Sequence, residues 1–461
     1  MSREAGSTIA PGAARFARHV DMAIVAIGAL MLAAYLAASV VLAKPGGRVV
    51  FGDATHHFVQ LRSAVFDRDL DFRNEYFRIY GLRGDEPGTE WITTDLTSTG
   101  HVRNYMPVGP ALLWAPLYLA VTGGERMLSA AGIGSRPDGF SRADQTVPGV
   151  TGILASTLAA WICWRLTRRY TTDRTAAMAT IAVWLGSHAI YYSLVSPSYS
   201  HAASMLAASL FVSRWLSTRR QPSSRHFAEL GALAGLAALM RWQDALLLVL
   251  PLFDAVTRPA SWRDRALGAA AAGSAWLVAF SPQMIVWNVL YGQPLAMPQG
   301  PSFLRWTDPH PFDVLFSTNH GLFTWAPLLL FATVGLALFL ARRRDLRLPV
   351  ALVLLFSWYI NAAVADWWAG EAYGARRFLS LFPFFVLGLA AWIDTPGWLV
   401  RSRAARLGVV AILVAANWFL LLQYELFMKG LEVVAPYPAG TIDMWLTRFA
   451  VPWRLFMWWR Q

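Results

Sequence analysis

Long apolar stretches separated by short polar turns dominate the pattern of this chain. Runs of spanning or near-spanning length begin near Asp21, Thr146, Thr175, Ser200, Phe227, Asp244, Ala266, Gly321, Leu348, Phe378 and Leu407. Because a helix needs about 20 mostly apolar residues to cross a bilayer, this pattern predicts about eleven transmembrane helices. The expected fold class is therefore an all-α polytopic integral membrane protein.

One further apolar run, 106–121, is short and contains three prolines. If it does not span, the N-terminus and the loops after Trp164, Val212, Val256, Leu340 and Trp392 share one side and hold 21 arginines. The short loops opposite then hold only Arg241, Arg305, Arg376 and Arg377. Short arginine-rich loops favour the cytoplasm. We therefore expect 106–121 to lie as a proline-rich helix against the outer surface, with the N-terminus inside and the C-terminus outside.

This topology divides the chain into five parts. They are a cytoplasmic tail (1–19), the first transmembrane helix (20–43), an extracytoplasmic loop with juxtamembrane helices (44–145), a transmembrane core (146–427) and an extracytoplasmic interfacial tail (428–461). Within the long loop we predict a helix from Asp53 to Asp67, followed by a solvated surface segment over 67–80. The tryptophan-rich tail is typical of an interfacial amphipathic helix.

Composition narrows the functional classes. The chain is 56% hydrophobic and 15% charged, with a formal net charge of +12. The arginines lie mainly in the turns between the apolar segments. This distribution favours a role in setting membrane topology over nucleic-acid binding. The single Cys163 excludes an intramolecular disulfide framework.

Polar clusters converge on the predicted outer face. They are Asp53 with His56 and His57, the segment 192–201, Arg241 to Asp244, Asn319 with His320, and Asp366 to Arg377. Polar residues near or inside a bilayer are costly and usually functional. On a helix, residues 53, 56, 57 and 60 share one face. An N-cap role for Asp53 is the simpler alternative.

The order of these features resembles the GT-C class of membrane glycosyltransferases. The motifs are Asp53 after the first span, the proline-rich 106–110, the span from Thr146 to Arg169 and the glycine-rich 231–241 ending at Arg241. Together they cover roughly the first 260 residues. The class uses polyprenyl-phosphate sugars and includes protein O-mannosyltransferases and the aminoarabinose transferases of lipid A.

The resemblance implies transfer of a hexose or pentose from a polyprenyl-phosphate donor to a hydroxyl of a lipid, glycan or protein. It places the enzyme in a bacterial inner membrane, with the active site facing the periplasm. Many members carry two adjacent acids after the first span, whereas Ala54 follows Asp53 here. A partner carboxylate, if required, would come from Asp366 or Glu371.

The chemistry of such a donor needs few groups. Phosphate leaves as a stable anion, so a base and cations suffice without a general acid. We predict Asp53 as the base, with inversion at the sugar carbon. The predicted substrate-binding residues are His56, His57, Tyr199, His201, Arg241, His320, Asp366, Trp368, Glu371, Arg376 and Arg377. The alternatives are snorkelling for the arginines and an aromatic belt for Trp367 and Trp368.

We expect no cofactor, although Asp53, His56 and His57 have the ligand types of a metal site. Adjacent histidines on a helix do not easily face one ion. The expected partners are the lipid bilayer, the lipid-linked donor and its acceptor, without nucleic acid. Two other functions stay open: a lipid or glycolipid transporter or flippase, and a non-catalytic subunit of an envelope glycan assembly complex.

Overall fold

The computed structural model describes residues 11–41, 48–80, 88–219, 223–370, 372–395, 401–428 and 441–459. Within these ranges the chain is helical, and its only β-bridges are two isolated ones, Leu96 with Val102 and Leu304 with Val364. The all-α expectation is confirmed.

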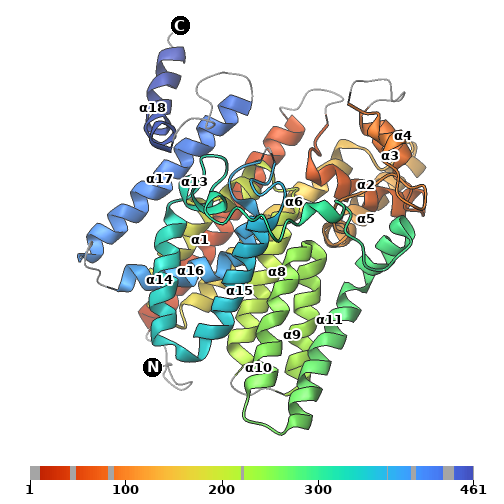
Figure 1. The fold of residues 1–461 in the computed structure, drawn as a ribbon. Helices are drawn as coiled ribbons and strands as arrows, with labels where there is room; N and C mark the ends of the chain where they lie inside the picture. The colour runs from red at the N-terminus through yellow and green to blue at the C-terminus, as the bar shows by residue number, and fades with distance from the viewer. Residues whose placement is uncertain are drawn as a thin grey trace.

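A bundle of helices forms the body of the molecule (Figure 1). Each of the eleven predicted segments contains one of its helices. They are α1 (Pro11–Leu36), α6 (Arg142–Thr167), α7 (Asp173–Leu185), α8 (Ser200–Thr218), α9 (Ser224–Met240), α10 (Val249–Thr257), α11 (Trp262–Tyr291), α14 (Leu328–Arg342), α15 (Arg344–Ala363), α16 (Phe382–Asp394) and α17 (Arg403–Met428).

Six helices in the described part of the chain are long and apolar enough to cross a membrane. They span Ala14–Val41, Arg142–Thr167, Trp262–Tyr291, Arg344–Ala363, Arg376–Asp394 and Arg403–Leu426. Their length and composition indicate a multi-pass membrane protein. The remaining bundle helices are shorter or less apolar, so the count of eleven spans stays a prediction.

Shorter helices gather at one end of the bundle. Figure 1 shows α2 (Asp53–Phe66), α3 (Arg73–Tyr80), α4 (Trp91–Thr94) and α5 (Gly109–Ala130) together at that end. The connection after α11 adds α12 (Asp313–Phe316) and α13 (Leu322–Trp325), and α18 (Thr441–Trp459) packs on α17.

The loop that carries α2 to α5 leaves and re-enters the bundle at the same end. Gln145 near the start of α6 accepts a hydrogen bond from the backbone of Val49 at 3.0 Å. Arg142 donates to the carbonyl of Val40, at the end of the first helix, at 3.3 Å. Helix α5, which contains most of the proline-rich run, therefore does not cross the bundle.

The arginine-rich turns meet at the opposite end. Asp21, in the first half of α1, pairs with Arg165 near the end of α6 at 3.1 Å. Arg219 at the end of α8 pairs with Asp254 of α10 at 2.9 Å and with Asp345 of α15 at 3.3 Å. These ion pairs join the helix ends that the arginine pattern places on one side of the membrane.

Small residues allow the helices to pack closely. A methyl group added at Gly231 of α9 would lie 2.0 Å from the carbonyl oxygen of Ala272 in α11. One added at Gly235 would lie 2.7 Å from the Cβ of Ala279. Glycines four residues apart are a common interface between membrane helices because they let backbones approach. This contact holds α9, and hence Arg241 at its end, against α11.

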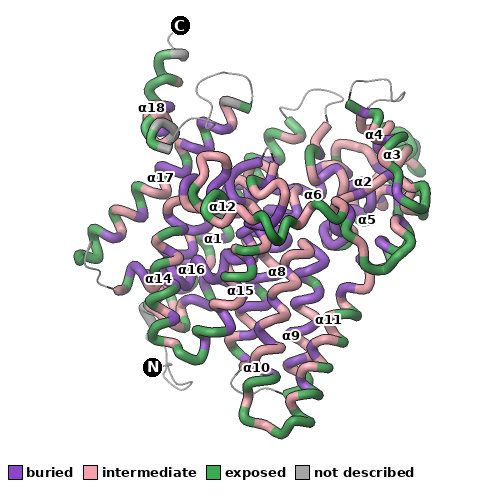
Figure 2. Tube along the Cα trace, viewed as in Figure 1, coloured by how far each residue is buried: buried purple, intermediate pink, exposed green. Residues whose placement is uncertain are grey.

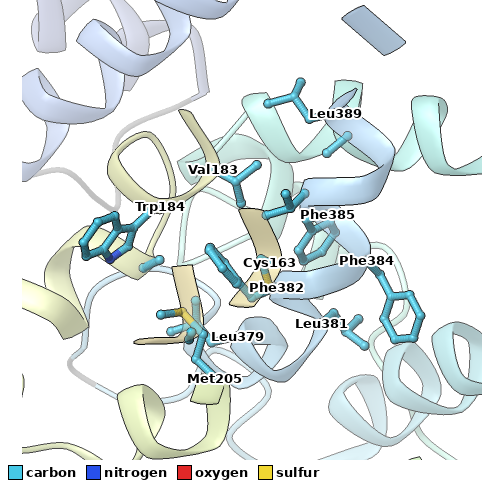
Figure 3. Close-up of a cluster of buried hydrophobic side chains, with 14 of the residues drawn as sticks. Cys163, Val183, Trp184, Met205, Leu379, Leu381, Phe382, Phe384, Phe385 and Leu389 are labelled. Carbon is cyan, nitrogen blue, oxygen red and sulfur yellow. The ribbon is translucent and has the colours of Figure 1, made fainter. Parts of the chain in front are cut away.

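The largest core cluster lies where α6, α7, α8 and α16 meet. Figure 3 shows Cys163 of α6 among Val183, Met205 and Phe382. Buried positions concentrate in this middle part of the bundle, whereas the turn between α10 and α11 is exposed (Figure 2). The one cysteine of the chain is buried and packs as an apolar residue.

The segment 67–80 differs from its prediction as a solvated stretch. Phe72, Glu75 and Tyr76 are fully buried. The two aromatic rings pack in the core beneath α2, and Arg62 pairs with Glu75 at 2.9 Å. The prediction was wrong because the aromatic residues, rather than the charges, decide how α3 packs.

Cysteine labelling tests the sidedness. Because Cys163 is buried, single cysteines placed at exposed Arg136, Arg225 and Arg344 report on their own positions. We expect an impermeant thiol reagent applied to intact cells to label position 136 and not positions 225 or 344. Labelling at 225 with protection at 136 would reverse the orientation and remove the outer placement of the polar clusters.

Candidate active site

Asp53 and Arg376 form an ion pair across 323 residues of sequence. Arg376 Nη1 donates to Asp53 Oδ2 at 2.5 Å, and the side chains are 13% and 25% exposed respectively. Asp53 begins α2, but Gly52 occupies the N-cap position, where no side chain caps the helix. The carboxylate therefore faces Arg376 and does not cap its own helix. This contact differs from the N-cap role that was the alternative for Asp53.

Tyr199 packs beside this ion pair. Gly52 has a φ of 53°, in the left-handed region that favours glycine, and a methyl group there would lie 2.1 Å from Tyr199 Oη. The guanidinium of Arg376 lies 5.7 Å from the centre of the Tyr199 ring. Gly52 thus gives the tyrosine room to pack against both partners.

The environment keeps Asp53 ionised. Burial acts to raise the pKa of this carboxyl, but the charge of Arg376, with a further contribution from Arg241, holds the pKa below its ordinary value. The group is therefore a carboxylate at neutral pH. The contribution from Arg241 also shows that this second arginine lies within electrostatic range.

Arg241 joins three elements at this end of the bundle. Its Nη1 donates to Ser200 Oγ at 3.1 Å and contacts His201 Nε2 at 3.3 Å, both at the start of α8. Its Nη2 donates to Gln243 at 3.4 Å, and Gln243 donates to the carbonyl of Arg377 at 2.5 Å. Among the described residues no carboxylate oxygen lies within 4.0 Å of Arg241.

Arg377 is held by Asp366. Its two terminal nitrogens donate to the backbone carbonyl and to Oδ1 of Asp366, each at 2.7 Å. The adjacent pairs Asp53–Arg376 and Asp366–Arg377 therefore bring the two carboxylates to one short helical segment, 376–381. Glu371, the other predicted acid, lies outside the described residues. Ala54, which follows Asp53 in α2, is buried in the hydrophobic core on which this helix packs.

His56 and His57 hold α2 in place. His56 Nδ1 hydrogen-bonds the hydroxyl of Tyr76 at 2.7 Å, and His57 Nδ1 hydrogen-bonds the carbonyl of Pro107 at 2.8 Å. Burial lowers the pKa of both imidazoles, that of His57 to about 4. Both rings are therefore neutral at pH 7 and add no positive charge to the site.

The histidines do not gather other metal ligands. In the described ranges no group of three histidine, cysteine, aspartate or glutamate residues is placed to hold a metal ion. Asp53 is engaged with Arg376 and His56 with Tyr76. The cation beside Asp53 in this structure is a guanidinium.

His320 and Trp368 form a separate contact at the edge of the site. His320 Nδ1 hydrogen-bonds the carbonyl of Trp368 at 2.8 Å, and its ring lies 4.5 Å from that of Trp325. Burial lowers the pKa of His320 to about 4, with a further contribution from Arg376. Trp368 is 37% exposed beside Trp367. Its ring is accessible, although its backbone makes the contact with His320.

Three residues outside the predicted set of site residues connect the site, two of them within the predicted polar clusters. Gln243 links Arg241 to the backbone of Arg377, Ser200 binds Arg241, and Gly52 makes room for Tyr199. Each lies within two positions of a predicted residue. Their nearness to Asp53, His201 and Arg241 in the sequence was therefore an available signal.

Comparison with solved structures finds similarity to ArnT from Cupriavidus metallidurans, crystallised with undecaprenyl phosphate. The match has 15% sequence identity and a TM-score of 0.42, and covers 93% of this chain and 76% of that chain. No family model and no curated protein matches the chain.

The close approach of Tyr199 to Gly52 can be tested by Gly52→Ala. We expect the variant to lower Tm, because the methyl group would displace either Tyr199 or the start of α2. Gly132→Ala is the matched control: its φ is 78°, but no atom lies within 4 Å of the added methyl. Both share a backbone penalty of about 1–2 kcal/mol. Equal Tm losses in detergent would mean that the Tyr199 contact adds nothing.

Proposed function

We propose that this protein is a membrane glycosyltransferase that moves a sugar from a polyprenyl-phosphate donor to an acceptor hydroxyl. The observation that carries the proposal is the Asp53–Arg376 ion pair, with Arg241 and Arg377 beside it at one end of a membrane-type bundle. A carboxylate next to several guanidinium groups provides a base and an anion-binding surface at the same place. The order of motifs along the chain supports the same chemistry.

Asp53 is the proposed base. The acceptor oxygen attacks the anomeric carbon of the sugar as its proton passes to a carboxylate oxygen of Asp53. The bond between that carbon and the phosphate oxygen breaks, and its electron pair leaves with the polyprenyl phosphate. Attack opposite to the leaving group inverts the configuration at the sugar carbon.

The arginines are the proposed phosphate ligands. Guanidinium groups match phosphate oxygens in a two-point geometry, and the leaving phosphate gains charge as the bond breaks. Arg376 uses Nη1 for Asp53, and its guanidinium makes no other hydrogen bond with the described residues. Nε and Nη2 can therefore bind a phosphate. Arg241, which has no carboxylate partner in the described chain, supplies a second cation.

Arg376 links the proton transfer to Asp53 with the departure of the phosphate. While it pairs only with Asp53, it holds the pKa of the carboxyl low. A phosphate that shares the guanidinium weakens its hold on Asp53, so the carboxylate becomes a better proton acceptor when the donor is in place. We infer that these groups act without a metal ion, because arginine takes the cation position beside Asp53.

The proposal extends to setting and specificity. We place the enzyme in a bacterial inner membrane with this end facing the periplasm, where a hexosyl or pentosyl group passes to a lipid, glycan or protein. His56, His57, His320 and Asp366 are proposed to shape the substrate-binding end, since each is tied to a neighbouring element. A flippase or a non-catalytic subunit would need no base at Asp53.

Asp53→Asn tests the base. The amide keeps the shape of the side chain but loses its charge and basicity, so we expect sugar transfer to fall by roughly 10²-fold or more. Because the pKa of Asp53 is lowered in the free enzyme, the kcat/KM of the wild type should not fall from protonation of this group until the pH drops below the ordinary aspartate range. Asp254→Asn, at the opposite end of the bundle, is the control for folding. Wild-type turnover in Asp53→Asn would leave only a structural role for this carboxylate.

Arg376→Lys tests the phosphate site. Lysine keeps the charge but loses the two-point geometry, so we expect turnover to fall at least roughly 10-fold while donor affinity changes less. Arg219→Lys is the matched control, because Arg219 is equally buried and ion-paired at the far end. Arg241→Lys and Arg377→Lys identify any second clamp. Unchanged turnover in all three variants would exclude the proposed phosphate clamp.

A further inference from the structure

Helix α18 has one face that is apolar and exposed. Five of its exposed large apolar residues are Ile442, Leu446, Phe449, Trp453 and Phe456, spaced by four, three, four and three positions. This spacing places them in one stripe along the helix. The other face packs on the second half of α17, where Gln423 hydrogen-bonds Thr447 at 3.4 Å. An exposed apolar stripe on a membrane protein is typical of contact with lipid.

Arg448 lies on the packed face and is fully buried. None of its three guanidinium nitrogens has a hydrogen-bond partner, and no carboxylate oxygen of the described chain lies within ion-pair distance. The guanidinium sits 4.1 Å from the centre of the Trp445 ring. That contact offsets part of the charge but satisfies none of the five N–H donors.

A buried and unpaired arginine is unusual because burial of a charge is costly unless an opposite charge accompanies it. Arginine cannot relieve this cost by losing its proton in the neutral range. The geometry of the donors matches an oxyanion, above all a phosphate bound at two points. No group of the described chain therefore balances the charge of Arg448. An anion from outside the described chain would balance it.

We propose that Arg448 binds the phosphate of a membrane phospholipid and that this contact fastens α18 to α17. The lipid source follows from the apolar stripe on the opposite face of α18, which places this helix in contact with the bilayer, where phospholipid phosphates are the abundant anions. The aromatic residues around it are those that concentrate at the headgroup level of a bilayer. A soluble anion would gain nothing from the stripe.

This site is distinct from the proposed donor-phosphate site. Arg448 acts electrostatically on Tyr373, whose ring stacks on that of Tyr191 at 5.1 Å. Arg376 contacts Asp53 and Tyr199, whereas Arg448 contacts Trp445, so these contacts of the two arginines share no residue. The lipid site does not depend on the transfer reaction, and Asp53→Asn should bind the lipid as the wild type does.

The test measures Tm of the full-length protein in dodecyl maltoside micelles without phosphate. Added phosphatidylglycerol should raise Tm of the wild type by about 3 °C or more, because a ligand that binds only the folded state stabilises it. Arg448→Met should have a Tm equal to or above that of the wild type without lipid, because it removes an unpaired buried charge. It should also lose most of the response to lipid.

Arg454→Met removes the same charge from an exposed position of α18 and should keep the lipid response. If Arg448→Met fails to fold, native mass spectrometry of Arg448→Gln supplies the readout, with at least a threefold loss of retained phosphatidylglycerol expected. A rise in the Tm of Arg448→Met with phosphatidylglycerol equal to that of the wild type, or undiminished retention of the lipid by Arg448→Gln, would overturn the proposal. So would an equal rise with inorganic phosphate alone, since the site would then take a free anion.

Discussion

The pairing of Asp53 with Arg376 is the contact on which the arrangement of this end of the molecule depends. One partner begins a loop helix and the other begins the segment that leads into α16, 323 residues later. Both charges are largely withdrawn from water. Removal of one would leave the other buried and uncompensated, at a cost of about 3–5 kcal/mol. The pair therefore requires α2, the start of α8 and the segment 376–381 to meet at one level.

Arginines perform different tasks at the two ends of the bundle. At the far end they join helix termini through ion pairs, as Arg219 does with Asp254 and Asp345. At the end that carries Asp53, only some of the arginines have carboxylate partners among the described residues. Arg241 contacts neutral groups, and Arg448 contacts an aromatic ring. The residue type is the same, but an arginine without a carboxylate partner is left able to bind an anion.

The sequence predicts the position of His56 and His57 but not the neighbours that their rings contact. His56 and His57 lie beside Asp53, as the helical spacing predicts, yet each ring hydrogen-bonds a neighbouring element. Their burial keeps them neutral. They position the helix that carries the carboxylate, while their contact with substrate stays a prediction.

The sequence by itself determined that the chain is helical and which turns share an end of the bundle. In lipid, backbone groups must be satisfied within each segment, so an apolar run of sufficient length has to form a helix. Arginine counts then separate the two ends. Local motifs also placed Asp53, Arg241 and Arg376 in one candidate site. These features depend on short stretches of chain, which is why composition and spacing reveal them.

Only the tertiary structure decided which of these residues touch. The pairing of Asp53 with Arg376, the burial of Phe72 and Tyr76 in a charged segment, and the isolation of Arg448 all depend on how helices pack. Packing is set by close contacts such as those of Gly231 with α11, between residues far apart in sequence. No periodicity along the chain encodes which helix lies beside which, so the partner of a buried charge appears only in three dimensions.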